Sequence, residues 1–467
     1  MKFLNRQPEL GRLRRLASRT EGGFGVVYGR RRVGKSRLLA EWLDGTTGIY
    51  TIADQSAPAL QRRYLAEALE PVLPGFAEVP YPDWRSLFAR LGREASVSGW
   101  RGPLVLDEAP YLFLTSPELP SILQAWLEQE ARRAKLVTVV AGSSQRLMQG
   151  LVLSAEAPLF GRAQELLELR PLHPSTVAEL GIRDPVSATE FLTAWGGIPR
   201  YWELATELGS DTLRNVAYLV LDPHGPLHRE PDRLLLEELP SAMELRPLLD
   251  AIGGGAHKLS EIAARLARPA TSLGRALQRL VELHLVVRET PFGEPPERSK
   301  RSLYRIADPF FRLWFRLVAP NRSRLVASPT PPVVEKATWE GLVAATWEDL
   351  CRRQLPALSL GGEPFVDLSP GQRWWHGAKA EWDVVSRSGG GGILLGEAKW
   401  SRRPFGPAEL EGLARALIAK PHPELSTRDQ RAPKALALFV PQVRPNTPPE
   451  IAGVKVIDGA QILQLKR

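Results

Sequence analysis

Cysteine is nearly absent from this chain, and that scarcity excludes several classes of protein. The 467 residues include one cysteine, Cys351, so neither an internal disulfide framework nor a cysteine-based zinc site is expected. The seven histidines are scattered without metal-ligand spacing. No apolar run reaches the length of a membrane-spanning helix, and the N-terminus lacks the apolar core of a signal peptide. These absences predict a cytoplasmic protein that works without a membrane.

Positive charge is in excess and unevenly distributed. The chain carries 61 Lys and Arg against 52 Asp and Glu, a net charge of +9. Residues 251–330 alone hold 14 basic and 6 acidic side chains, a surplus almost as large as that of the whole chain. A local surplus of this kind favours a surface that binds nucleic acid, and DNA is the expected partner.

A complete phosphate-binding motif, G-x-x-x-x-G-K-S, occupies residues 29–36. An apolar run over 24–28 predicts a buried strand before it, and residues 37–43 predict a helix after it. Backbone N–H groups of such a loop surround a phosphate at the positive end of the helix. Lys35 is expected to neutralise the β- and γ-phosphate oxygens, and the Ser36 hydroxyl to hold Mg²⁺. The sequence therefore predicts binding of ATP with Mg²⁺.

A second acidic motif follows the apolar run Leu104-Val-Leu. Asp107 is expected to order the Mg²⁺ shell, and Glu108 to activate the water that attacks the γ-phosphate. Adjacent acidic residues at a strand end are also common in solvated corners without a function. After a phosphate loop at this separation, the motif favours hydrolysis over binding alone.

Two further segments complete the expected ATPase site. An apolar run over 136–141 predicts another strand, and Ser143 and Ser144 at its polar tip are expected to sense the γ-phosphate. Arg162 is expected to stabilise transition-state charge, in its own chain or from a neighbouring subunit of a homo-oligomer. The alternative for Arg162 is an ordinary surface ion pair.

Strand and helix patterns alternate through residues 1 to about 205, which predicts a mostly parallel α/β sheet. The expected strands are Phe24–Tyr28, Gly48–Ala53, Pro103–Asp107, Leu136–Ala141 and Gln164–Leu169.

Taken together, these motifs resemble the archaeal-type P-loop ATPases, relatives of the signal-transducing and AAA-type ATPases. The matching segments are Phe3-Leu-Asn-Arg6-Gln-Pro-Glu9-Leu, the phosphate loop, Leu106-Asp-Glu-Ala-Pro-Tyr111, Gly142-Ser-Ser, Pro158-Leu-Phe-Gly-Arg162 and Gly196-Gly-Ile-Pro199-Arg200-Tyr201. Phe160 departs from the tyrosine usual in this family. The resemblance implies that the segments around Arg6 and Pro199 flank the nucleotide. The expected nucleotide-binding residues are Arg6, Gly29, Val33, Gly34, Lys35, Ser36, Arg37, Asp107, Ser143, Ser144 and Pro199.

The basic middle region predicts a winged helix. Residues 259–267 and 271–285 read as two amphipathic helices joined by a turn, followed by a ribbon with a basic tip. In this pattern the second helix enters the major groove and the wing touches phosphate. The alternative is a winged helix that packs on the rest of the protein and never meets DNA. The candidate DNA-binding residues are Arg275, Arg279, Arg298, Lys300 and Arg301.

Carboxylates near the C-terminus form the pattern D-x(13)-E-x-K, with Asp383, Glu397 and Lys399. Residues two apart in a strand share a face, so Glu397 and Lys399 project together, and Asp383 joins them if the two strands pair. Two carboxylates beside a lysine make a Mg²⁺ site that activates water against a phosphodiester. The pattern is similar to the restriction-endonuclease-like (PD-(D/E)xK) nuclease core. The resemblance adds Glu348 as a supporting metal ligand, and the region looks like a domain of unknown function that follows the ATPase in one branch of the family.

The predicted organisation is an α/β P-loop ATPase core (1–175), a helical lid (176–240), a winged-helix domain (241–326) and a restriction-endonuclease-like α/β domain (333–467). The leading hypothesis is an ATPase coupled to a Mg²⁺-dependent DNA nuclease, with genome defence or mobile elements as the setting by analogy alone. Two alternatives stay open. One is an ATP-controlled DNA-binding regulator with an inactive nuclease-like domain, and the other is a signalling ATPase that does not bind DNA.

Overall fold

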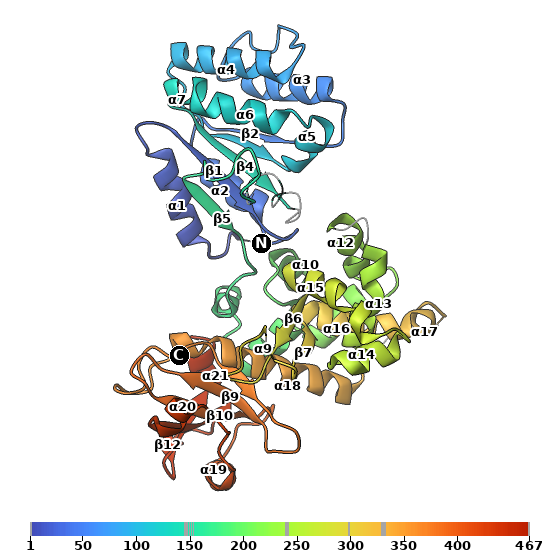
Figure 1. The fold of residues 1–467 in the computed structure, drawn as a ribbon, viewed down its shortest axis with the longest axis vertical. Helices are drawn as coiled ribbons and strands as arrows, with labels where there is room; N and C mark the ends of the chain where they lie inside the picture. The colour runs from blue at the N-terminus through green and yellow to red at the C-terminus, as the bar shows by residue number, and fades with distance from the viewer. Residues whose placement is uncertain are drawn as a thin grey trace. The chain divides into compact units, whose positions relative to one another are not determined.

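A computed structural model describes residues 2–465 apart from 144–147, 149, 151, 153, 239–241, 298 and 328–332. The chain divides into two compact units (Figure 1). The first contains residues 1–172 and 198–203, and the second contains residues 173–197 and 204–467. Ser144 and Arg298, two of the expected site residues, lie outside the described residues.

The first unit is built on a parallel sheet of five strands in the order β2-β3-β4-β1-β5. The strands are β1 (Gly23–Tyr28), β2 (Ile49–Ile52), β3 (Leu104–Asp107), β4 (Val137–Gly142) and β5 (Glu165–Glu168). β3 and β4 are buried along their whole length, as expected for central parallel strands covered on both faces. The five strands expected from the sequence and their parallel arrangement are confirmed.

Helices cover this sheet (Figure 1). They are α1 (Gln7–Ala17), α2 (Lys35–Leu43), α3 (Pro58–Leu69), α4 (Trp84–Ser98), α5 (Pro110–Thr115), α6 (Leu119–Glu128) and α7 (Glu130–Arg133). One apolar core joins Phe24 and Leu106 of the sheet to α3, α4 and α6, whose buried residues include Leu65, Leu91 and Trp126. α1 packs against β1, β5 and α2. The sheet is therefore held rigidly, and its carboxyl ends carry the loops described below.

The second unit begins with a mostly helical region. Its elements are η2 (Pro174–Leu180), α9 (Pro185–Trp195), α10 (Pro199–Glu207, which starts in the first unit), α11 (Thr212–Val216), the π-helical turn η3 (Ala217–Leu221), α12 (Glu230–Glu238) and α13 (Ala242–Gly253).

Two helices and a hairpin follow, in the order expected from the sequence. They are α14 (Leu259–Arg265), η4 (Ala270–Ser272), α15 (Gly274–Glu282), and the antiparallel strands β6 (Val286–Glu289) and β7 (Leu303–Ile306). Leu277 and Leu280 of α15 are buried together with Leu273 directly before the helix, which confirms the amphipathic pattern. The chain continues through α16 (Pro309–Leu317), η5 (Ala319–Asn321) and α17 (Arg322–Ala327).

The C-terminal part of the second unit is a mixed six-stranded sheet in the order β12-β13-β11-β10-β9-β8. Its strands are β8 (Gln372–Trp374), β9 (Trp382–Arg387), β10 (Ile393–Ala398), β11 (Lys434–Val440), β12 (Glu450–Ile451) and β13 (Val454–Asp458). Its helices are α18 (Lys336–Arg353), η6 (Leu355–Ala357), α19 (Pro407–Ala419), α20 (Thr427–Arg431) and α21 (Gly459–Ile462). β10, β11 and β13 run parallel, and α18 packs against β9 and β10. The chain is therefore α/β, with a separate mixed sheet after the parallel one.

None of the described helices combines the length and the apolar character that a membrane crossing needs.

Candidate functional site

The phosphate loop joins the end of β1 to the start of α2, as the motif predicts. Gly29 has φ 145°, and a Cβ on it would lie 2.3 Å from the carbonyl oxygen of Leu169, the residue after β5. Gly34, which precedes the first residue of α2, has φ 95°. Both values lie in the region that side chains disfavour, so the two motif glycines are required by the backbone path itself.

Lys35 is folded back over the loop. Its Nζ donates hydrogen bonds to the carbonyl oxygens of Gly29 (2.8 Å) and Arg30 (3.2 Å), and the residue is only 4% exposed. A buried ammonium group held by carbonyl oxygens can exchange these bonds for phosphate oxygens without moving the helix. The lysine is thus available at the loop for a nucleotide.

Ser36 and Asp107 meet at the edge where β1 and β3 end. The Ser36 hydroxyl donates to Oδ2 of Asp107 over 2.7 Å. A hydroxyl and a carboxylate next to a phosphate loop are the oxygen donors that Mg²⁺ takes together with phosphate and water. The donor set therefore fits the expected metal.

Tyr50 is a member of this cluster that the sequence did not indicate. Its hydroxyl donates to the same oxygen of Asp107 from the neighbouring strand β2. Burial, and then the hydrogen bond with Asp107, raise the pKa of the Tyr50 hydroxyl, so the group remains a donor. The sheet order places β2 beside β3 and brings Tyr50 into reach. The sequence indicated that Tyr50 lies in a strand, but it did not indicate which strand lies beside that one.

Glu108 lies one residue beyond β3 and has a left-handed φ of 51°. Its backbone N–H donates to Oδ1 of Asp107 over 2.8 Å. Its carboxylate accepts a hydrogen bond of 2.5 Å from the hydroxyl of Ser143, which directly follows β4. The structure therefore brings three expected residues together at the carboxyl ends of two adjacent strands.

Arg6 braces the phosphate loop from the side. Its Nη2 donates to the carbonyl oxygens of Val33 (3.0 Å) and Arg170 (2.6 Å), and its Nη1 pairs with Glu9 (3.0 Å). The residue is 7% exposed and has φ 70°. A guanidinium that grips a loop carbonyl fixes the path of the loop, so this geometry supports a positioning role for Arg6.

Pro199 also lies against the loop, because its Cγ is 3.7 Å from the place where a Cβ on Gly34 would be. Arg37 lies on the exposed side of α2, one residue beyond Ser36.

Arg162 forms an ion pair with Glu128 (2.8 Å) at the end of α6 and donates to the carbonyl oxygen of Phe160 (3.0 Å). This pairing corresponds to the surface-ion-pair alternative, and the proposed transition-state role requires Arg162 to leave Glu128.

A second cluster of expected residues lies on the mixed sheet. β9 and β10 pair antiparallel, with Val384 opposite Gly396, which brings Asp383 beside Glu397. Oδ2 of Asp383 accepts a 3.1 Å hydrogen bond from the backbone N–H of Ala398. Burial, reinforced by the carboxylates of Glu397 and Glu348, raises the pKa of Asp383 to about 6. The two strands thus hold two carboxylates in one electrostatic environment.

Two lysines bind Glu397. Lys399 Nζ lies 2.9 Å from Oε1, and Lys420, at the end of α19, pairs with Oε2. Lys420 was not expected, because 23 residues separate it from Glu397 and only the folded path of α19 brings it near. Within the described ranges, no group of three or more His, Cys, Asp and Glu side chains could hold a metal ion. The cluster therefore offers a carboxylate pair, which Mg²⁺ accepts when waters complete its shell.

Glu348 approaches this pair from α18 and is itself engaged. Its Oε2 lies 3.5 Å from Nη1 of Arg352, and the same Nη1 donates to the backbone carbonyl oxygen of Asp383 (3.1 Å). Arg352 is thus a second unexpected member of the cluster, joining Glu348 to Asp383. An amphipathic helix gives no sign that one of its arginines faces a strand.

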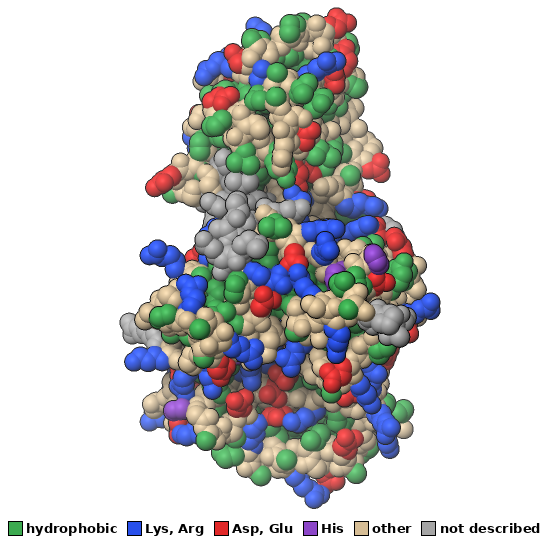
Figure 2. Space-filling view, turned by 90° about the vertical axis from the view of Figure 1, so that its right-hand side faces the viewer, with side chains coloured by type: hydrophobic (Ala, Val, Ile, Leu, Met, Phe, Trp, Pro, Cys, Tyr) green, Lys and Arg blue, Asp and Glu red, His purple; other side chains and the backbone are tan. Residues whose placement is uncertain are grey.

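The expected DNA-binding arginines and lysine differ in their surroundings. Arg275 and Lys300 are exposed, and Arg279 is half-buried on α15. Arg301 already has partners within the protein: it forms an ion pair with Glu294 and donates a hydrogen bond to the carbonyl oxygen of Trp375 (3.2 Å). On the face drawn in Figure 2, Lys and Arg side chains are interleaved with Asp and Glu.

The segment that connects β6 to β7 is anchored to the mixed sheet. Phe292, between β6 and β7, is 6% exposed and belongs to the apolar core that contains Trp374, Trp382 and Leu395. Its N–H donates to the carbonyl oxygen of Arg373 over 2.8 Å. Part of the ribbon expected to touch DNA is therefore committed to packing within the protein.

Comparison with known proteins identifies two regions of the chain. Residues 3–203 match a family described as an ATPase domain predominantly from Archaea. Residues 314–410 match a family described as archaeal and bacterial proteins of unknown function. A segment similar to the first family is therefore followed by a segment similar to the second.

Three archaeal proteins are similar to this chain over about two thirds of its length or more. An uncharacterized protein of Methanocaldococcus jannaschii, MJECL04, is 28% identical over 403 residues, which cover 85% of this chain and 87% of that protein. Among solved structures, the Walker-type ATPase PABY2304 of Pyrococcus abyssi is 21% identical with a TM-score of 0.48, covering 67% of this chain and 96% of that one. The ORC2 protein of Aeropyrum pernix is 18% identical with a TM-score of 0.46, covering 70% and 96%.

Proposed function

We propose that the ATPase domain of residues 3–203 binds ATP with Mg²⁺ and hydrolyses it, and that this reaction controls an action on DNA. One observation carries the first part. A continuous series of hydrogen bonds runs from Ser36 through Asp107 and Glu108 to Ser143 beside the phosphate loop, with lengths of 2.7, 2.8 and 2.5 Å. This series supports the proposal, because it would put the oxygens that hold Mg²⁺ and a carboxylate base next to each other beside the bound phosphates.

The loop residues bind and orient the phosphates. Lys35 exchanges its bonds to loop carbonyls for bonds to the β- and γ-phosphate oxygens. Ser36 and Asp107 are the residues that would hold Mg²⁺, whose charge polarises the phosphate oxygens when it is bound. Arg6 fixes the loop through the Val33 carbonyl, and Pro199 closes its other side.

Glu108 is the group that accepts a proton from the attacking water. The oxygen of that water forms a bond to the γ-phosphorus while the bond from phosphorus to the ADP oxygen breaks. Ser143 holds the Glu108 carboxylate through its hydroxyl and thereby fixes the direction of the remaining lone pairs. Arg162 would reach the phosphate only after release from Glu128.

The test is steady-state ATPase activity with nucleotide binding measured beside it. Lys35→Ala is expected to lose ATP binding, whereas Glu108→Gln keeps binding and loses most turnover. Glu41→Gln, on the exposed side of α2, is the matched control and keeps both. Full turnover in Glu108→Gln would show that another group activates the water.

For the action on DNA, we propose Mg²⁺-dependent phosphodiester cleavage at Asp383, Glu397 and Lys399 in the C-terminal domain (333–467). The supporting observation is that β9 and β10 bring the two carboxylates together, with the Lys399 ammonium 2.9 Å from Glu397. Asp383 and Glu397 would hold the metal, and Glu348 would support them from α18. Lys399 would orient the water that attacks the phosphodiester.

Residues 241–326 would hold the DNA as a winged-helix domain, and residues 176–240 would form a lid for the nucleotide. Arg275, Arg279, Arg298 and Lys300 are the proposed phosphate contacts. An alternative is a regulator that binds DNA under ATP control without cutting it. The salt bridges from Lys399 and Lys420 to both oxygens of Glu397 favour this alternative, because a lysine can replace a metal as the partner of a carboxylate.

The deciding experiment is cleavage of supercoiled, linear and single-stranded DNA with Mg²⁺ or Mn²⁺, with and without ATP. Lys399→Ala is expected to abolish cleavage, and Lys35→Ala reports whether ATP gates it. Lys455→Ala on β13 is the control and is expected to cut normally. DNA binding without cleavage in any lane would favour the regulator, and an absence of DNA binding would favour a signalling ATPase.

A further inference from the structure

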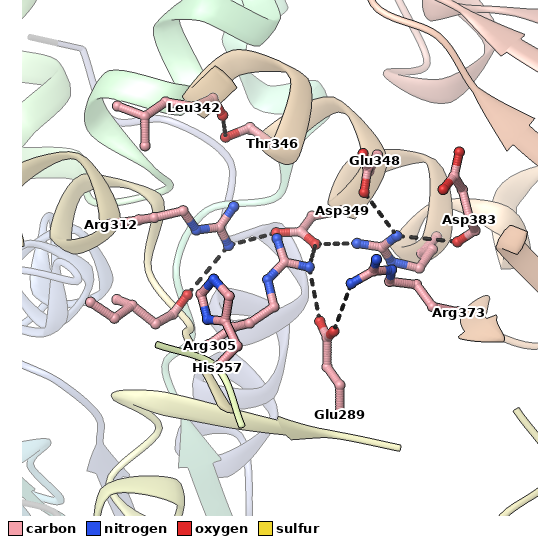
Figure 3. Close-up of polar contacts among 12 residues, drawn as sticks. His257, Glu289, Arg305, Arg312, Leu342, Thr346, Glu348, Asp349, Arg373 and Asp383 are labelled. Atoms are coloured by element: carbon pink, nitrogen blue, oxygen red, sulfur yellow. Dashed lines mark hydrogen bonds and ion pairs between the residues drawn. The ribbon is translucent and has the colours of Figure 1, made fainter. Parts of the chain in front are cut away.

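A pocket of about 250 Å³ in the second unit shares Arg352 with the carboxylate cluster of Asp383 and contains none of the proposed catalytic or metal-binding residues. Its walls come from the hairpin β6–β7, from α16, from the end of α18 and from residues 371–373. Six arginines line it, together with two acidic residues: Arg288, Arg305, Arg312, Arg352, Arg353 and Arg373, with Glu289 and Asp349. Figure 3 shows several of these side chains converging on the two carboxylates.

Asp349 is shared by several guanidinium groups. Arg352 lies 2.5 Å from its Oδ1 and Arg312 lies 2.6 Å from its Oδ2, while Arg305 is 3.6 Å away. Burial alone would raise the pKa of Asp349, but these cations hold it well below its usual range. Three guanidinium groups therefore share one carboxylate, and together they have the charge and the N–H donors to bind a further anion.

The second acidic residue of the pocket is also shared by two arginines. Glu289 lies 3.1 Å from Arg305 and 3.8 Å from Arg373. Outside the lining, Glu348 pairs with Arg352 and Glu381 pairs with Arg373. Even with these two carboxylates counted, arginines remain in excess around the pocket.

Particular guanidinium groups account for this excess. Arg288 donates to the hydroxyl of Ser302 (2.8 Å) and to the carbonyl oxygen of Ser299 (3.2 Å), neither of which is charged. Arg353 is exposed, and the described residues include no carboxylate within ion-pair distance of it. Nε and Nη1 of Arg312 are buried without a hydrogen-bond acceptor in the described part of the chain. Donors and positive charge are thus left for an acceptor that the protein does not supply.

We propose that this pocket binds a phosphate group, either on a small phosphorylated molecule or at the 5′ end of a DNA strand. The guanidinium fork matches pairs of phosphate oxygens, and a tetrahedral anion can bridge several forks at once. The volume suits a phosphate or diphosphate and is below that of most pockets that enclose a whole drug-sized ligand. This proposal does not depend on ATP hydrolysis or on DNA cleavage.

Calorimetric titration with inorganic pyrophosphate tests the pocket directly. The titrated protein is the full chain carrying Lys35→Ala, so that the phosphate loop does not contribute. Arg353→Gln and Arg373→Gln are each expected to weaken binding at least tenfold. Arg415→Gln, at an exposed position of α19 in the same unit, is the matched control and is expected to leave the affinity unchanged. Because Arg353 is exposed, its substitution does not disturb a buried ion pair.

A second titration identifies the source of the phosphate. Fluorescence anisotropy compares DNA duplexes that end in a 5′-phosphate with duplexes that end in a 5′-hydroxyl. A preference for the phosphorylated end that disappears in Arg353→Gln identifies a DNA end, whereas pyrophosphate binding without that preference identifies a small phosphorylated molecule. If neither pyrophosphate nor the 5′-phosphate depends on Arg353 or Arg373, the proposal is wrong.

Discussion

Ser143 and Glu108 meet across the carboxyl ends of two adjacent parallel strands, where the serine hydroxyl donates a 2.5 Å hydrogen bond to Oε1 of the glutamate. Ser143 is 4% exposed, so this bond is shielded from water. A hydroxyl that binds one oxygen of a carboxylate leaves the other oxygen to face a substrate. The relationship makes Ser143 a positioning residue for the proposed base.

Ser143→Ala is therefore expected to lower kcat for ATP hydrolysis by about tenfold, which corresponds to the loss of one hydrogen bond to a charged group. The KM for ATP should change little, because the phosphate-binding groups are untouched. Ser143→Thr keeps the hydroxyl and should recover part of the rate. Equal rates for Ser143→Ala and the unmodified chain would contradict the positioning role.

Tyr50→Phe removes one donor from Asp107 and keeps the ring. Because a partner that orients a metal-binding carboxylate strengthens its metal site, we expect the Mg²⁺ concentration for half-maximal ATPase activity to rise about tenfold. Nucleotide binding without Mg²⁺ serves as the control and should be unchanged. A lower Mg²⁺ requirement would mean that Tyr50 competes with the metal for Asp107.

Much of the candidate nucleotide site could be predicted from the sequence because its signals are local. Buried parallel strands appear as continuous apolar runs, and the motif residues follow those runs directly, as Lys35 follows the first strand and its loop. Ser143 and Glu108 were likewise visible at strand ends. The sequence did not indicate the order of the strands in the sheet, and that order brings Tyr50 to Asp107.

The second unit was harder to predict because its contacts join distant segments. Lys420 reaches Glu397 from the end of a helix, and Arg352 turns from α18 toward the backbone of Asp383. Phe292 lies between β6 and β7, where the sequence indicated only a ribbon with a basic tip, and it is buried among side chains that come much later in the chain. Amphipathic patterns indicate which side chains are buried but not which element they pack against.

Phe292→Ala should loosen the anchoring of the hairpin on the mixed sheet. Removing a buried phenylalanine costs about 3 kcal/mol, which corresponds to roughly a hundredfold faster local opening. Hydrogen exchange measured by mass spectrometry is expected to accelerate in peptides of β8 and β9 and to stay unchanged in β3. Tyr218→Ala, at an exposed position of the same unit, is the control. Unchanged exchange in β8 and β9 would show that the hairpin does not support this sheet.

The salt dependence of DNA binding should distinguish the exposed Arg275 and Lys300 from Arg301, which forms an ion pair with Glu294. If Arg275 and Lys300 contact phosphates, alanine at either position reduces the slope of log K against log salt by about one. Arg301→Ala is expected to leave the slope unchanged, because Glu294 already neutralises that guanidinium. Equal losses from all three substitutions would mean that the ion pair between Arg301 and Glu294 opens on DNA.

Asp383 should make the second unit less stable as the pH rises. Its pKa of about 6 in the folded protein lies above the usual value for Asp of about 3.9, so the folded state holds a proton that the unfolded state releases between these values. Stability from this group is present below about pH 4 and is lost as the pH rises through about 6, at a total cost of about 3 kcal/mol. Asp383→Asn should therefore raise the calorimetric melting temperature at pH 7.5 and have little effect at pH 4. Asp367→Asn, at an exposed position of the same unit, is the control. An equal gain in melting temperature from Asp383→Asn at both pH values would exclude the titration of Asp383 as the cause.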